Sequence, residues 1–408
     1  MLTWPTNHRP MPRGSLIRFC LVFLILLGLP ASGPAATSQP PVYIGFDGEI
    51  GHATSTSDEA IIMGARIAIA EINQAGGVLG GRPLELVIKD NRSVPARGVA
   101  NIRAFAEIPD LVAVLGGKFS PVVLEELPIL HEKKMIMLAP WSAADQIIDH
   151  DYQPNFCFRL SLKDSWAAQA MLEYGRKRGF KKFAILLPLT AWGRSNEQAL
   201  NNYAAKHQEI VFSTVQWFHW GDKTLLAQYK KILQSRAEAV IFVTNEDEGA
   251  VLVKEVAALP AAERLPLISH WGVTGGDFVK LSGDALLQLD FATVQTYSFF
   301  DRRRPEKLAR FYQTAEKLFQ VRRPEDILSP VGVAHTYDLI HILALAIDKA
   351  ASVDREKVRD ALEKVADYDG LIKFYPRPFT AQRHEALTPE DLFMGRFRAD
   401  GAILRITE

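Results

Sequence analysis

The sequence predicts an α/β fold of two doubly wound, Rossmann-like lobes joined by hinge strands. Three observations support this prediction. Short apolar runs alternate with amphipathic stretches from Val42 onward, which is the pattern of a parallel sheet with crossover helices. The alternation completes one set of strands and helices and starts again after Phe156–Leu160. The chain has 408 residues, enough for two domains of ordinary size, each with its own core.

The first lobe begins with a strand and a helix. Val42–Phe46 is apolar, and apolar residues then recur at helical spacing from Ile61 to Ile72. Gly76 and Gly77 follow, and they supply the left-handed turn that ends a helix. Further strands are expected at 84–88, 111–115 and 135–138, with helices at 99–107 and 122–132.

The second lobe repeats this alternation. The expected strands are 183–187, 211–215, 239–243 and 265–269, and the expected helices are 196–206, 225–234 and 249–258. After a strand at 291–295, helical patterns cover 306–319, 331–350 and 355–365, and short strand-like pieces cover 371–374, 392–397 and 403–406.

Flexible linkers rich in proline or serine are absent from the sequence between the lobes. We therefore expect short hinges near residues 158–162 and 290–298. The N-terminal lobe is assigned residues 41–158 plus about 299–370. The C-terminal lobe is assigned residues 159–298 plus about 371–408.

Residues 1–36 have the order of a secretory signal peptide. Arginines precede the apolar run Phe19–Leu29, and small residues follow from Ala31 to Ala36. The run has about eleven residues, whereas a membrane-spanning helix needs roughly twenty. We expect an exported protein cleaved near residues 31–37; a retained membrane anchor is the alternative.

The charge balance and the cysteine count limit which binding partners and which disulfide chemistry are expected. The 47 basic residues balance the 47 acidic ones, so no overall field attracts nucleic acid, and a small-molecule ligand is the expected partner. Cys157 is the one cysteine that remains after signal cleavage, so no internal disulfide forms, and we expect a buried, inert thiol. A monomer is expected.

The sequence carries no recognised catalytic motif, and we predict that the protein is not an enzyme. It has no H-E-x-x-H, G-x-S-x-G or phosphate-binding loop, and the glycines at 76–81 follow a helix rather than a strand. The histidines are scattered without metal-ligand spacing. No metal site and no cofactor are expected.

One stretch closely resembles a known family. It runs from Gly64 through Ala70-Glu71-Ile72-Asn73 and the glycine turn to Arg82-Pro83-Leu84 and Lys89-Asp90-Asn91. Phe158-Arg159, Tyr337-Asp338 and Asp369-Gly370 add to the similarity. Over roughly 42–400 the chain resembles the periplasmic leucine/isoleucine/valine-binding proteins, the substrate receptors of branched-chain amino-acid ABC transporters.

The resemblance implies a function. It implies a periplasmic substrate-binding protein that captures a small amino-acid-like or carboxylate solute between its lobes and delivers it to the membrane permease of an ABC transporter. The alternative is a ligand-sensing protein that presents its solute to a membrane receptor kinase. The residues do not separate these two roles.

Loops at the carboxyl ends of the first-lobe strands are candidate ligand contacts, because backbone donors and helix N-termini are free there. In the segment 116–121, Ser120 is a helix-cap candidate and, by the resemblance, the carboxylate-binding serine. In the segment 139–145, Ala143 stands where the family has a threonine, which leaves Ser142 as the nearest hydroxyl. Trp141 replaces a small residue there; packing between loops is the alternative for it.

The second lobe offers three further candidate ligand contacts: Trp192, Asn245 and Trp271. Trp192 matches a family tyrosine that covers the ligand, and a Ser195–Gln198 capping box is expected to start its helix. Asn245 is preferred over Asp247 and Glu248, which are explained as acidic residues in a first helical turn.

Trp271 stands where amino-acid-binding members have an acid for the ligand ammonium. An aromatic face attracts a cation but does not replace a carboxylate charge. We therefore expect a carboxylate ligand that is not bound like a simple aliphatic amino acid: either the ligand lacks an amine, or Glu246 and Asp247 of the neighbouring loop take over the ammonium charge.

Overall fold

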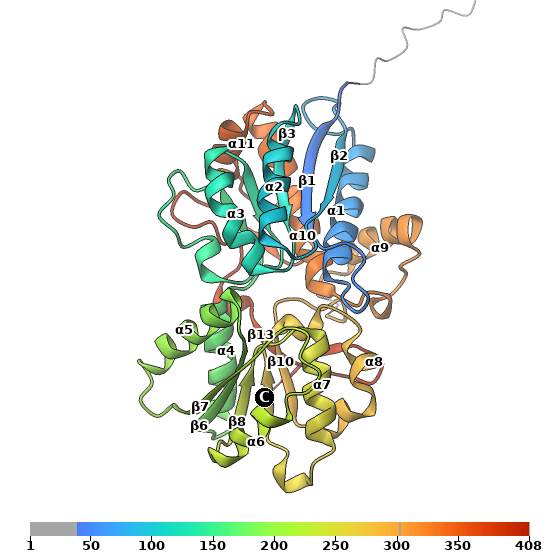
Figure 1. The fold of residues 1–408 in the computed structure, drawn as a ribbon. Helices are drawn as coiled ribbons and strands as arrows, with labels where there is room; N and C mark the ends of the chain where they lie inside the picture. Colours follow the sequence, from blue (N-terminus) through green and yellow to red (C-terminus); the bar gives the residue numbers. More distant parts are fainter. Residues whose placement is uncertain (1–38, 302, 408) are drawn as a thin grey trace, which may run out of the picture. The chain divides into compact units, whose positions relative to one another are not determined.

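Two separate sheets, each with helices on both faces, organise the chain (Figure 1). The computed structural model describes residues 39–301 and 303–407, and the predicted signal segment 1–36 lies outside them. The five-stranded sheet has the order β2-β1-β3-β4-β5 and is parallel throughout. The seven-stranded sheet has the order β14-β13-β10-β9-β8-β6-β7. The predicted fold class is confirmed.

The first lobe is built on β1 (Val42–Gly48), β2 (Leu84–Asp90), β3 (Leu111–Gly116), β4 (Ile136–Ala139) and β5 (Cys157–Arg159). One face packs against α2 (Pro95–Ala106) and α3 (Ser120–Glu132), and the other against α1 (Ser57–Gln74) and α10 (Pro330–Ala350). Successive strand residues alternate between these faces, so Val114 joins the α2–α3 core and Leu115 the α1–α10 core.

α1 and α10 pack closely because Gly64 of α1 has no side chain. A Cβ at Gly64 would lie 2.3 Å from the backbone oxygen of Val333 in α10. Of the described helices, α10 is the one with the length and mean hydropathy, 1.4, of a membrane span, but 89% of that stretch is buried within the protein. α10 is therefore the core helix of this lobe.

The second lobe is built on the parallel strands β6 (Lys182–Pro188), β7 (Val211–Phe218), β8 (Ala239–Phe242), β9 (Leu267–Ser269) and β10 (Phe291–Gln295). β13 (Phe393–Phe397) runs antiparallel to β10, and β14 (Ile403–Arg405) antiparallel to β13. α4 (Asp164–Lys177) and α5 (Ala191–Ala204) cover one face, and α6 (Leu226–Gln234), α7 (Glu246–Ala257) and α8 (Phe278–Ser282) cover the other.

The remaining elements are short or peripheral. They are α9 (Pro305–Phe319), α11 (Arg355–Leu362), the hairpin β11 (Tyr368–Asp369) and β12 (Phe374–Tyr375), and six 3-10 turns at Asp145–Ile147, Ala261–Glu263, Trp271–Thr274, Gly283–Gln288, Pro324–Asp326 and Pro389–Asp391.

Two local predictions about helix starts are wrong. α5 begins at Ala191, and the Thr190 hydroxyl accepts the Gly193 N–H, so the expected Ser195–Gln198 capping box does not start this helix. Ser120 is the first residue of α3 and its side chain makes no cap hydrogen bond, because its oxygen is used elsewhere.

The segment after residue 370 contacts both lobes. β13 and β14 extend the second sheet, as assigned from the sequence. Leu371 and Tyr375, by contrast, donate hydrogen bonds to Asp338 of α10, and Glu385 pairs with Arg159 at the end of β5. The first-lobe contacts thus continue past 370, and the exact lobe boundary stays a prediction.

Candidate functional site

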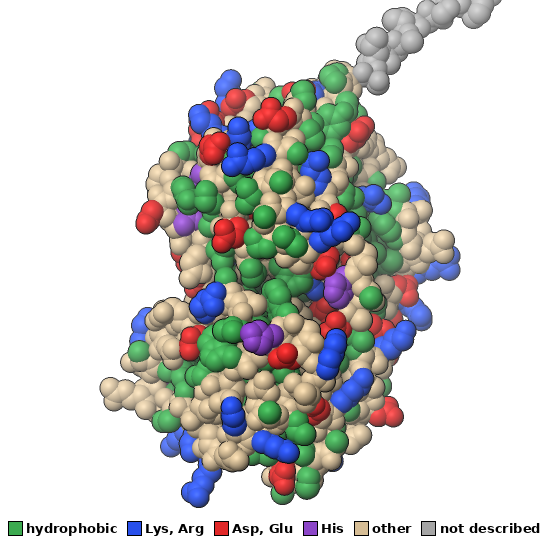
Figure 2. All heavy atoms as spheres, viewed as in Figure 1, with side chains coloured by type: hydrophobic (Ala, Val, Ile, Leu, Met, Phe, Trp, Pro, Cys, Tyr) green, Lys and Arg blue, Asp and Glu red, His purple; other side chains and the backbone are tan. Residues whose placement is uncertain are grey.

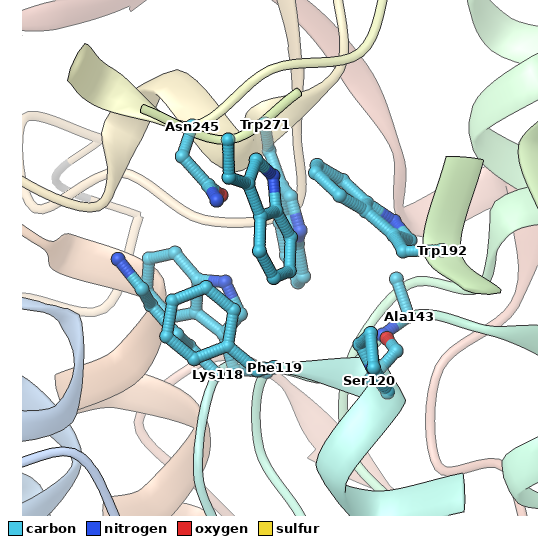
Figure 3. A pocket seen from close by; sticks show the side chains of 10 residues that line it. Lys118, Phe119, Ser120, Ala143, Trp192, Asn245 and Trp271 are labelled. Atoms are coloured by element: carbon cyan, nitrogen blue, oxygen red, sulfur yellow. The ribbon is translucent and has the colours of Figure 1, made fainter. Parts of the chain in front are cut away.

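A pocket between the two sheets lies at the carboxyl ends of strands from both lobes. Figure 3 shows Asn245, Trp271 and Trp192, from the starts of second-lobe helices and turns, projecting toward Lys118, Phe119, Ser120 and Ala143 of the first lobe. The free cavity between these side chains has a volume of only about 10 Å³, room for about one water molecule, so the lobes have to separate to admit a solute. The complete lining is Lys118, Phe119, Ser120, Pro121, Trp141, Ala143, Trp192, Trp220, Asn245 and Trp271.

Aromatic rings form most of the wall. The rings of Trp141 and Trp271 lie 5.5 Å apart, centre to centre, and those of Phe119 and Trp220 lie 5.0 Å apart. Both pairs join the first lobe to the second. Once the lobes separate enough to admit a solute, these aromatic walls suit a small, flat, largely apolar molecule.

Trp192 is held in place by a buried polar group behind it. Its indole Nε1 donates to Asp164 Oδ1 at 3.1 Å, at the start of α4. The buried His270 ring packs edge-on to Trp192 at 5.1 Å, with its Nε2 3.3 Å from the same carboxylate oxygen. These contacts fix the indole plane and leave its ring face for the pocket.

The two predicted serine hydroxyls both bind backbone groups of the first lobe. Ser120 Oγ accepts the backbone N–H groups of Ala143 and Ala144 at 3.1 and 3.2 Å. Ser142 Oγ donates to the Gly117 carbonyl at 2.6 Å, and Ser142 is not part of the pocket lining. The Ser120 hydroxyl hydrogen stays free to donate, whereas the Ser142 hydrogen is used.

Lys118 is the cation of the pocket, and it crosses between the lobes. Its Nζ lies 2.9 Å from Glu246 Oε1 at the start of α7, and both side chains are buried. It also donates to Ser55 Oγ and lies 4.8 Å from the Phe119 ring centre. The sequence explained Asp247 and Glu248 only as acidic residues that favour the dipole of α7. In the structure the first turn of α7 also binds the other lobe, through the ion pair of Glu246 with Lys118.

The loop before α1 makes further contacts with the second lobe. The Thr54 hydroxyl donates to Asp247 Oδ2 at 2.8 Å, and the Thr56 N–H donates to the Gly275 carbonyl at 2.6 Å. Asp58, the second residue of α1, accepts the backbone N–H groups of Glu49 and Lys118. Burial raises the pKa of Asp58 to about 7, although the Lys118 charge opposes this rise.

Two polar groups of the lining have no hydrogen-bond partner among the described residues. They are the Asn245 side-chain amide at the start of α7 and the Trp220 indole N–H. The Trp220 nitrogen is buried, and buried polar groups are normally paired, so this N–H is available to a solute; Asn245 is only partly buried, and its amide can also bind water. The described lining contains no aspartate or glutamate.

The structure brings six of the seven predicted site residues to this pocket: Ser120, Trp141, Ala143, Trp192, Asn245 and Trp271. The sequence pointed to the segment 116–121 but to Ser120 alone as a ligand contact in it. Three of its other residues also line the pocket: Lys118, Phe119 and Pro121. Trp220 was missed altogether. It follows the carboxyl end of β7, so the strand-end rule applied to that strand as well would have found it.

The comparison with known proteins decides the family. A family model described as periplasmic binding protein matches residues 41–402. The chain belongs to the periplasmic binding protein family. A Leu/Ile/Val-binding protein homolog 1 from Brucella abortus is 23% identical over 356 residues, covering 86% of this chain and 84% of the relative.

Two solved structures show the same fold as this periplasmic binding protein. A type 1 periplasmic binding protein from Bordetella pertussis gives a TM-score of 0.80 at 22% identity, covering 90% of this chain and 100% of that one. An ABC transporter solute-binding protein from R. palustris, in complex with benzoate, gives 0.74 at 16% identity, covering 90% and 95%. The family consists of solute-binding proteins, which confirms that this chain is not an enzyme.

Proposed function

We propose that this periplasmic binding protein captures a small, flat carboxylate without an amine and delivers it to the permease of an ABC transporter. The observation that carries the proposal is the described pocket lining, which has one cation, Lys118, five aromatic side chains (Phe119 and four tryptophans) and no acid. A carboxylate fits this lining, whereas an ammonium group lacks a counter-charge there.

Lys118 and Ser120 are the proposed groups at the anion end. Lys118 Nζ has three N–H donors, of which Ser55 and Glu246 take two. Ser120 keeps its hydroxyl hydrogen while its oxygen accepts two backbone N–H groups. A solute carboxylate could accept from both, and Ala143 beside them leaves room for its oxygens.

The tryptophans are the proposed contacts for the body of the solute. Trp141, Trp192 and Trp271 surround the space from both lobes, so a planar solute stacks on at least one ring face. Each aromatic contact contributes about 0.5–1.5 kcal/mol beyond burial. Asn245 then selects for a solute with a polar group at the second-lobe end.

Two acids at the start of α7 lie close to the pocket without lining it. Glu246 Oε1 pairs with Lys118 while its Oε2 has no partner among the described residues, and Asp247 accepts the Thr54 hydroxyl. The relative from R. palustris was solved with benzoate, and relatives named for leucine, isoleucine and valine have similar sequences. Both ligand classes carry a carboxylate, and the lining described above favours the first.

The proposal also includes export of the protein to the periplasm and delivery of the solute to a permease. The family supports a periplasmic location, and the order of residues 1–36 supports export with cleavage near 31–37. Acidic and basic side chains are interspersed over the face shown in Figure 2, as the zero net charge predicts. A neutral small-molecule carrier acting as a monomer is consistent with this surface.

Mass spectrometry of the solute that copurifies with the protein tests this function. The protein is purified without added ligand, denatured, and the released small molecules are identified. An amine-free carboxylate, present near one per chain and absent after Lys118→Met, supports the proposal. Recovery of leucine, isoleucine or valine would contradict the proposed ligand class and leave the family assignment intact.

A further inference from the structure

A second cluster of chemically active side chains lies in the first lobe, outside the pocket. His131 comes from the last turn of α3, His150 from the loop after the 3-10 turn at 145–147, and Cys157 from the start of β5. One potential ligand atom from each lies within 4.8 Å of the other two. The sequence predicted no metal site, because these residues have no motif spacing; the fold alone brings them together.

His131 is oriented as a metal ligand is. Its Nδ1 lies 2.8 Å from the Leu127 carbonyl oxygen, which can only accept, so Nδ1 carries the hydrogen. Nε2 therefore carries the lone pair, which accepts the Phe156 N–H at 3.3 Å, and a metal ion bound at Nε2 would replace this hydrogen bond. A backbone carbonyl that fixes the tautomer through the other ring nitrogen is a recurring feature of metal-binding histidines.

His150 has no hydrogen bond to explain its position. Both ring nitrogens are buried and have no partner among the described residues. Ring packing accounts for its faces, since it meets His131 edge-on at 4.8 Å and Tyr152 at 5.4 Å. Packing does not account for two unpaired nitrogens, because such atoms are nearly always hydrogen-bonded or bound to an ion.

Cys157 completes a set of donors that suits zinc. The thiol is fully buried, and imidazole and thiolate are the ligands Zn²⁺ prefers. Ligands at zinc distances of about 2.0–2.3 Å lie roughly 3.3–3.7 Å apart, so the cluster has to contract by about 1 Å. His131 and His150 are only partly buried, which leaves one side for a water ligand and for metal entry.

We propose that His131 Nε2, one ring nitrogen of His150 and the Cys157 sulfur form a Zn²⁺ site in the first lobe. Both imidazoles bind as neutral ligands. The Cys157 S–H bond breaks and an S–Zn bond forms, so one proton leaves for solvent per metal bound.

The proposed site is independent of solute capture. None of its three residues belongs to the pocket lining. Ser120 and His131 lie at opposite ends of α3, about 16 Å apart along the helix axis. Zinc is thus expected to stabilise the first lobe by binding the folded state, without contacting the solute.

Metal binding to the protein without an affinity tag tests the proposal. We expect one Zn²⁺ per chain after dialysis, measured by elemental analysis, and release of one proton per zinc, measured by calorimetry in buffers of different ionisation enthalpy. Co²⁺ as a substitute should give a thiolate-to-metal charge-transfer absorption. Cys157→Ser should abolish that absorption, and His150→Gln should weaken zinc binding at least tenfold.

His207→Gln is the matched control, since His207 stacks on Tyr203 in the second lobe and should leave both readouts unchanged. If Cys157→Ser does not fold, the comparison of zinc binding by His150→Gln and His207→Gln decides the test. His150 lies in a partly buried loop, where the substitution should be tolerated. Less than half an equivalent of zinc on the unmodified protein, absence of the charge-transfer absorption, or equal binding by His150→Gln and His207→Gln would overturn the proposal.

Discussion

Lys118 of the first lobe and Glu246 of the second form a buried ion pair, with 2.9 Å between Nζ and Oε1. The pair lies beside the pocket, and it exists only while the two lobes are close together. Removing one partner of a buried pair leaves an uncompensated charge, which costs about 3–5 kcal/mol if the site stays dry. Opening of the lobes avoids that cost, because water then reaches the remaining charge.

Glu246→Gln should therefore favour an open arrangement of the lobes. The lysine loses its counter-charge, and rehydration on opening becomes the lower free-energy state. Small-angle scattering on the ligand-free variant should give a larger radius of gyration than the unmodified protein. Glu356→Gln is the control, because its pair with Lys134 is exposed and is expected to contribute only about 0–1 kcal/mol. Equal radii for Glu246→Gln and Glu356→Gln would contradict the prediction.

Asp58 should make the protein less stable as pH rises from about 4 to about 7. Burial raises its pKa to about 7 in the folded protein, from an ordinary value of 3.8. Between these values the folded state binds more protons than the unfolded state, so the free energy of unfolding falls with rising pH, by a few kcal/mol at most. The slope of chemical denaturation midpoints against pH should flatten in Asp58→Asn.

Other buried carboxyl groups with raised pKa values, such as Asp338, are present in both proteins and cancel in this comparison. A slope between pH 4 and 7 that is the same in Asp58→Asn and in the unmodified protein would show that Asp58 does not titrate there.

Ser120→Ala should destabilise the protein as well as weaken solute binding. The backbone N–H groups of Ala143 and Ala144 lose their acceptor, and unpaired buried donors cost about 1–3 kcal/mol each. Urea denaturation should show a lower free energy of unfolding. Ser165→Ala is the control, since this partly buried hydroxyl has no hydrogen bond among the described residues. Similar stabilities for both variants would mean that the Ser120 bonds contribute nothing.

Trp192 should report solute binding by fluorescence. A stacked solute changes the surroundings of this buried indole, and Trp192→Ala should weaken binding about tenfold, since a lost aromatic contact and its burial together cost on the order of 1.4 kcal/mol. Trp166→Phe is the control, because Trp166 packs beside Lys163 outside the pocket. Solute affinity that is unaltered in Trp192→Ala would exclude this ring from the binding surface.

Local patterns in the sequence predict the fold well. Apolar runs mark the strands, and Gly76 and Gly77, with φ of +112° and +73°, end α1 as expected. The strand-end rule also finds most of the pocket, because the carboxyl ends of parallel strands meet at one edge of each sheet. These features depend on residues that are close together in the chain.

Such local patterns do not predict which distant segments of the chain come into contact. The partner of Lys118 is Glu246, 128 residues away, and the Ser142 hydroxyl binds the Gly117 carbonyl instead of facing the pocket. His131, His150 and Cys157 meet only because α3, a loop and β5 converge. Each of these depends on how elements pack, which the order of residues along one strand or helix does not contain.

The pocket's lack of an acid among its described residues is the central claim, and calorimetric titration with matched ligand pairs tests it most directly. Leucine is compared with 4-methylpentanoate, and phenylalanine with 3-phenylpropanoate, because each pair differs only in the amine. We predict that the amine-free acid binds more tightly in both pairs, by about tenfold or ~1.4 kcal/mol. Tighter binding of the amino acid in both pairs would contradict the account.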